Sequence, residues 1–150
     1  MATYTNRVVW KGGHVGHTYC ENGTDMEFSA PPALFGHPGV MTPEDAFMMA
    51  INTCVHMMVI WAAERFRLDL VAYECLAEGT VTERLDRTSS FTRVVLRPRV
   101  RVRGGTRLQV ERILAMARKF STIADSVACE VVIEPDIEIL PPGRPEGGEE

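Results

Sequence analysis

Hydrophobic residues run almost without interruption through one stretch in the first half of the chain. Residues 46–63 carry no charged side chain. Thr42 just before this run is a good N-cap, Pro43 suits the first helical position, and Asp45 can complete a capping box. The pattern predicts a helix from there to about Arg67, apolar on nearly every side. The run has only the minimum length for a membrane span and is rich in Met and Ala, so a buried helix of a soluble protein explains it better.

Short alternating segments precede this helix, and longer ones follow it. Residues 5–10, 17–20 and 25–29 predict three strands separated by Gly-containing turns. Residues 70–82 and 91–103 predict a long hairpin. In its second strand one face is apolar and the other face carries a stripe of arginines: Arg93, Arg97, Arg99, Arg101 and Arg103.

The last third of the chain predicts one more helix and one more strand. Thr106 and Gln109 form a second capping box ahead of an apolar helical stripe that ends near Phe120. Residues 129–140 predict a strand bent at Pro135. The order of three strands, helix, two strands, helix and strand is that of an α+β protein.

Length and composition indicate a globular protein. The chain has 150 residues, of which 45% are hydrophobic, and a net charge of −4. We expect residues 1–140 to form one domain and the Pro-, Gly- and Glu-rich residues 141–150 to be a disordered tail. The charge gives no general case for a nucleic-acid or membrane partner. Because the N-terminus lacks the features of a signal peptide, we expect a cytoplasmic protein with reduced cysteines.

The arginine stripe admits two interpretations. It could bind nucleic acid, or it could pair across the strands with acidic residues such as Glu74 and Glu78 on a solvated sheet face. No aromatic residue interleaves the arginines, as nucleic-acid binding would favour, so we favour ion pairing.

A metal site is conceivable at His14, His17 and Cys20, which lie within seven residues. Their spacing matches no helical ligand motif, and the four cysteines show no CxxC spacing. We therefore expect neither a metal ion nor a cofactor.

Cys54 lies in the middle of the apolar helix, and two interpretations of it remain open. A free cysteine in such a place is usually a small packing residue, and apolar burial makes a thiol inert. A reactive Cys54 would need a nearby cation to hold the thiolate and a polar group to position a substrate. Glu44 lies ten residues earlier, about 15 Å along a straight helix, so it would have to reach Cys54 through a bend or from a second subunit.

The segment "TPEDAFMMAINTC", residues 42–54, resembles the opening of the long helix in the OsmC/Ohr family of thiol-dependent hydroperoxide peroxidases. There a Pro-Glu pair begins the helix and the peroxidatic cysteine follows ten residues after the Glu, as Glu44 and Cys54 do here. The resemblance covers residues 5–140. It implies an intertwined homodimer whose antiparallel sheets wrap two central helices, with active sites at the subunit interface.

Two positions depart from the family pattern. Ser121, in "KFSTIADSV", stands where the family has its resolving cysteine, and His14 follows the Gly pair where the hydroperoxide-specific branch has an arginine. The resemblance then implies a one-Cys peroxidase for organic hydroperoxides. Cys54 would be the attacking thiolate, Glu44 would orient the substrate, His14 would stabilise charge when protonated, and an external thiol would be the reductant.

Two alternatives to the peroxidase remain. One is a member of the family that no longer turns over a substrate but binds a small apolar ligand, with the pocket lined by the helix methionines: Met48, Met49, Met57 and Met58. The other is an interaction protein that acts through the arginine stripe.

Overall fold

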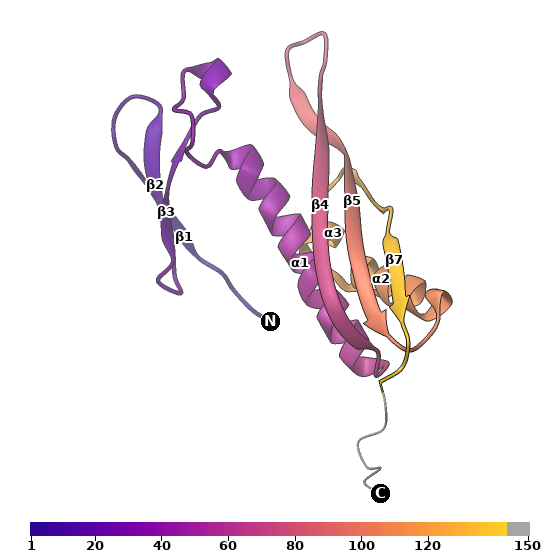
Figure 1. Ribbon diagram of the computed structural model, residues 1–150. Coiled ribbons are helices and arrows are strands. Elements are labelled where there is room, and N and C mark those ends of the chain that lie inside the picture. Colours follow the sequence, from indigo (N-terminus) through magenta and orange to yellow (C-terminus); the bar gives the residue numbers. More distant parts are fainter. Residues whose placement is uncertain (144–150) are drawn as a thin grey trace, which may run out of the picture. The chain divides into compact units, whose positions relative to one another are not determined.

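The computed structural model describes residues 1–143, which form two compact units, Met1–Met49 and the part of the chain that begins at Ala50. Figure 1 shows the order of the elements along the chain. The expected single domain over 1–140 stays a prediction. The expected disordered tail falls mostly on residues 144–150, which lie outside the described residues.

The first unit contains a three-stranded antiparallel meander of β1 (Asn6–Trp10), β2 (Val15–Cys20) and β3 (Asp25–Ser29) in the order β1-β2-β3. All three predicted strands are confirmed, and β2 begins two residues earlier than predicted. A single 3-10 turn, η1 (Pro32–Leu34), follows.

The long helix α1 spans Pro43–Arg65 and begins as the sequence predicts. The Asp45 carboxylate accepts hydrogen bonds from the backbone N–H of Thr42 at 2.9 Å and from its hydroxyl at 3.0 Å, while the Asp45 N–H donates back to the Thr42 hydroxyl at 3.1 Å. This reciprocal arrangement satisfies donors that the first turn would otherwise leave unpaired. By length and composition α1 could also cross a membrane, a property that core helices of soluble proteins share.

One stripe of α1 is fully buried and faces the second sheet. It consists of small and β-branched residues at helical spacing: Ile51, Val55, Val59, Ala62 and Ala63. Ala62 and Ala63 pack with Ile113 of the next helix, with Leu68 and Leu70 beside them.

The second sheet is built around β5 (Ser89–Arg103), which pairs antiparallel with β4 (Asp69–Glu83) on one side. On its other side it pairs in parallel with β6 (Glu130–Ile133) and then with β7 (Asp136–Leu140). The predicted single bent strand is therefore two strands, separated at Glu134 and Pro135.

This interruption also explains a proline inside the central strand. Pro98 lies within β5, where a missing N–H would normally break the ladder. The Leu96 carbonyl accepts a hydrogen bond from the Glu134 N–H at 2.8 Å, so the backbone nitrogen of Pro98, two residues on, faces the same side. It thus lies opposite the gap between β6 and β7, where no ladder bond is lost.

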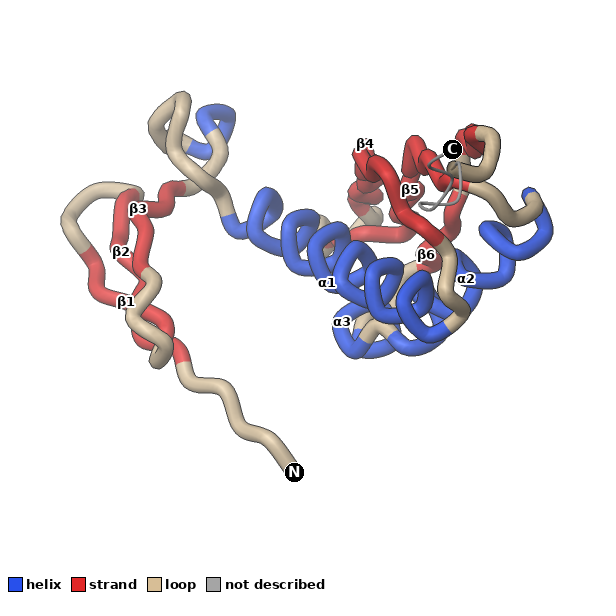
Figure 2. Tube along the Cα trace, turned by 60° about the horizontal axis from the view of Figure 1, so that its bottom comes forward, coloured by secondary structure: helices blue, strands red, loops and turns tan. Residues whose placement is uncertain are grey.

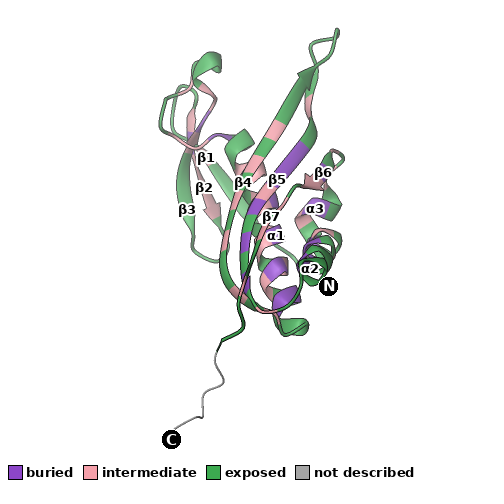
Figure 3. Cartoon of the chain, turned by 45° about the vertical axis from the view of Figure 1, so that its right-hand side comes forward, coloured by how far each residue is buried: buried purple, intermediate pink, exposed green. Residues whose placement is uncertain are grey.

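Helices α2 (Arg107–Phe120) and α3 (Thr122–Ser126) complete the unit. The Thr106–Gln109 capping box is present at the start of α2, as predicted. Figure 2 shows α2 and α3 on the same side of the sheet as α1. Val94, Val95 and Leu96 of β5 are buried in a row, and from Leu96 onward buried residues alternate with more exposed ones. These buried residues belong to the core under the helices (Figure 3).

Candidate thiol site

Cys54 lies at the border of the buried stripe of α1. It follows Ile51 by three positions, precedes Val55 by one, and is itself half-buried. Trp61 lies seven positions after it, which is close to two helical turns, so the two side chains share one flank of the helix. The Trp61 ring packs edge-on against Phe120, with 5.6 Å between ring centres. The Cys54 flank of α1 is therefore the flank that meets the end of α2.

Ser121, which the sequence analysis placed at the position of the family's resolving cysteine, directly follows Phe120. It is completely buried and caps α3, because its hydroxyl accepts a hydrogen bond from the Ala124 N–H at 3.2 Å. Both Figure 1 and Figure 2 draw α3 beside the middle of α1, the part of the helix that carries Cys54. The side chain at this position is thus a buried structural cap of α3.

Glu44 is exposed in the first turn of α1, and Asp45 rather than Glu44 makes the capping bonds. Ten residues of helix span about 15 Å, so α1 does not bring Glu44 and Cys54 of one chain into contact.

The histidines and Cys20 of the first unit have local partners. His14 is exposed in the turn before β2, with its ring 5.9 Å from that of Phe35. His17 pairs with Asp25 at 2.7 Å. Cys20 accepts a hydrogen bond from the Asn6 amide at 3.7 Å. Among residues 1–143, no three His, Cys, Asp or Glu side chains are grouped to hold a metal ion.

The opposite flank of α1 carries a polar cluster that the sequence analysis missed. The Asn52 amide donates to the Cys75 carbonyl at 3.1 Å, and His56 stacks on Tyr73 with 4.6 Å between ring centres. These side chains and Thr53 surround a small pocket of about 150 Å³. His56 thus contacts β4 on the other side of the helix from Cys54. The sequence did offer a signal for this cluster, because Asn52 and His56 lie one turn apart on an otherwise apolar helix and therefore share a face.

The surroundings of Cys75 keep its thiol protonated and so disfavour its reaction as a nucleophile. Burial raises the pKa of its thiol, and the hydrogen bond from Tyr73 opposes this rise only in part. Burial also raises the pKa of Tyr73. A thiol with a raised pKa is a poor nucleophile at neutral pH.

The remaining thiols differ in exposure. Cys20 is exposed and Cys129 is half-buried in the turn before β6, and all four cysteines are free.

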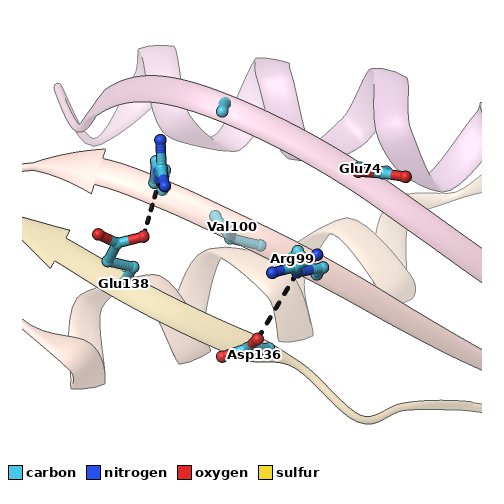
Figure 4. Close-up of a pocket in the computed structure, with 7 residues that line it drawn as sticks. Glu74, Arg99, Val100, Asp136 and Glu138 are labelled. Carbon is cyan, nitrogen blue, oxygen red and sulfur yellow. Dashed lines mark hydrogen bonds and ion pairs between the residues drawn. The ribbon is translucent and has the colours of Figure 1, made fainter.

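The arginine stripe forms ion pairs, as the sequence analysis favoured, and four of the six pairs are with β6, β7 or Glu134 between them. Figure 4 shows Arg99 directed at Asp136, with Glu138 and Glu74 along the same shallow pocket of about 280 Å³. Glu74 lies opposite Arg99 in the β4–β5 register but makes no ion pair with it. The pairs and their separations are Arg93–Glu130 (3.7 Å), Arg97–Glu78 (3.6 Å), Arg97–Glu134 (3.3 Å), Arg99–Asp136 (3.8 Å), Arg101–Glu138 (2.8 Å) and Arg103–Asp69 (3.8 Å).

The positive charge of this face is therefore balanced by carboxylates from neighbouring strands. A surface of paired charges offers a polyanion little net attraction. This favours a structural role for the stripe.

The chain matches the family model of OsmC-like proteins over residues 36–136. Among solved structures, it is similar to an OsmC-like protein of unknown function from Vibrio cholerae, with 25% identity and a TM-score of 0.82 over 90% of this chain and 99% of that one. It is also similar to the organic hydroperoxide resistance protein OsmC from Legionella pneumophila, with 17% identity and a TM-score of 0.73 over 92% of this chain and 98% of that one.

A third similar structure is the organic hydroperoxide resistance protein OhrB of Bacillus subtilis, with 18% identity and a TM-score of 0.65 over 91% of this chain and 98% of that one. No curated protein sequence matches the chain. At 17% and 18% identity, the last two structures show a common fold only. The family match covers residues 36–136, which is most of the chain. The α+β architecture expected from the sequence is that of these structures, and the chain belongs to the OsmC-like family.

Proposed function

We propose that the protein reduces organic hydroperoxides through Cys54 by a one-Cys route. The observation that carries the proposal is the place of Cys54: it follows Glu44 by the family spacing and lies half-buried at the edge of the α1 core stripe. A thiol in such a place has apolar surroundings that can hold an organic substrate, and it is partly accessible to that substrate from solvent. The names of two similar structures, both organic hydroperoxide resistance proteins, support the substrate class.

In the proposed reaction the Cys54 thiolate attacks the outer oxygen of the peroxide. The O–O bond breaks and Cys54 becomes a sulfenic acid, while the alkoxide takes up the proton that the thiol had released to solvent on ionising and leaves as the alcohol. One external thiol then forms a mixed disulfide with Cys54 and releases water. A second external thiol displaces Cys54 and leaves as the disulfide of the reductant. The external thiol is needed because Ser121 cannot form a disulfide.

The proposal assigns Glu44 to orient the substrate and His14 to stabilise charge when it is protonated. Helix geometry separates Glu44 from the Cys54 of its own chain, so we propose a homodimer in which the partner subunit's Glu44 completes the site. We also propose that the protein works in the cytoplasm, where thiol reductants are available.

The test is consumption of cumene hydroperoxide with either dithiothreitol or a dihydrolipoyl compound as the thiol. We expect the wild-type protein to oxidise two thiols for each peroxide and Cys54→Ser to fall to the rate of the thiol alone. Cys129→Ser, a matched change at another half-buried thiol, should keep the activity. Equal rates for wild type and Cys54→Ser would refute the peroxidase and leave binding of a small ligand without turnover as the function.

A further inference from the structure

An apolar cavity lies between the end of α1 and the outer side of α2, within the second unit. Its volume is about 600 Å³, a size typical of small-molecule sites. Phe66 and Leu68 line one side, and a helical stripe of α2 lines the other. The apolar members of that stripe are Ile113, Ala115, Met116 and Phe120.

The polar residues at this cavity are cationic or neutral, and none is acidic. They are Gln109, Arg112 and Lys119, all on α2. Within residues 1–143, Arg112 and Lys119 have no acidic partner, and Lys119 lies 5.6 Å from the ring centre of Phe120.

The other cations of α2 have partners within the fold. Arg107 pairs with Glu111 at 3.0 Å, and Arg118 donates to the Val131 carbonyl at 3.0 Å. The arginines of β5 are paired as well. Among the cations of α2, the two without an acidic or backbone partner in the described residues thus both line this cavity.

We propose that this cavity binds an amphipathic anion, a hydrocarbon chain that ends in a carboxylate. The chain would cover the apolar wall formed by Phe66, Met116 and Phe120, and the carboxylate would pair with Arg112 and Lys119. Apolar burial supplies affinity, and the two cations select the charged end. Cys54, Glu44 and His14 do not line the cavity, so the inference does not depend on peroxidase chemistry.

Decanoate, used below its micelle concentration, is a suitable probe. Binding is measured by isothermal titration calorimetry on the full-length protein. Location is read from Trp61, which contacts Phe120 of the cavity wall. Trp10→Phe removes the other of the chain's two tryptophans, so that fluorescence reports Trp61 alone. We expect saturable binding with a matching change in Trp61 fluorescence, and no comparable binding of decanol.

The charge selection is tested with Arg112→Gln combined with Lys119→Gln. We expect this pair to weaken decanoate binding by at least about tenfold, the loss of one or more charge-assisted hydrogen bonds. Arg107→Gln removes the same charge from the same helix away from the cavity and should leave affinity within about twofold. Circular dichroism of both variants verifies that α2 is intact.

Several results would overturn the proposal. They are absence of decanoate binding, binding heat without a Trp61 response, equal affinity for decanol, and equal weakening by Arg107→Gln. Binding to phosphatidylglycerol vesicles without binding of free decanoate would also overturn it, because the face would then recognise a lipid surface.

Discussion

At the scale of single residues, Cys54 and Ser121 define the chemistry that the chain can support. Cys54 borders the core of α1 and shares its flank with Trp61, which contacts Phe120. Ser121 follows Phe120 and is buried as the cap of α3. The family's second thiol would thus fall on the side of α1 that carries Cys54, if the alignment of residues 119–127 with the resolving segment is correct.

Ser121→Cys should therefore form a disulfide with Cys54 after one equivalent of organic hydroperoxide. A disulfide needs Cα atoms within about 7 Å, and the shared fold would supply that geometry. Loss of the capping hydroxyl should lower the free energy of unfolding by about 1 kcal/mol. Peptide mapping without reductant detects the linked 54–121 peptide.

Ser126→Cys places a thiol at the exposed end of the same helix and serves as the control. It should give no linked peptide. If Cys54 of the Ser121→Cys protein is oxidised without a link, the alignment is wrong. If Cys54 is not oxidised at all, the peroxidase proposal fails.

At the scale of elements, the side chains of α1 are mostly apolar, so its first turn supplies the polar groups that cap the helix. Thr42 and Asp45 satisfy one another's backbone donors there. Thr42→Ala should lower the free energy of unfolding by about 1 kcal/mol, since alanine offers no acceptor to the Asp45 N–H. The midpoint of urea unfolding measures the change.

Thr42→Ser is the matched control, since its hydroxyl can still accept and donate these hydrogen bonds. It should remain within about 0.5 kcal/mol of wild type. Equal destabilisation by Thr42→Ser would mean that the methyl group of Thr42, rather than the cap, matters.

At the scale of the whole molecule, the fold of one chain leaves large apolar side chains of α1 exposed to solvent. Met57 is 52% exposed, and Trp61, one helical turn later, is 37% exposed. Contiguous exposed apolar residues mark an interface. We expect a homodimer at micromolar concentration, measured by sedimentation velocity.

Met57→Glu should shift this protein towards the monomer, because a carboxylate on the buried face of a dimer would lose its hydration. Leu85→Glu introduces the same charge at the tip of the β4–β5 hairpin, where Leu85 is fully exposed, and should leave the dimer intact. A wild-type monomer at these concentrations would contradict the proposed subunit arrangement and, with it, the role of the partner subunit's Glu44.

The sequence alone determined features that depend on near neighbours along the chain. Both capping boxes, the alternation of the second half of β5 and the start of α1 follow from local hydrogen bonds and side-chain periodicity, and all are present. Only the tertiary structure decided which strands supply the acidic partners of the arginines, because β6 and β7 are distant in sequence. It also decided that His56 faces Tyr73 rather than Cys54, and that Arg112 and Lys119 remain unpaired beside an apolar cavity. These features arise from packing between elements, which periodicity within one element does not specify.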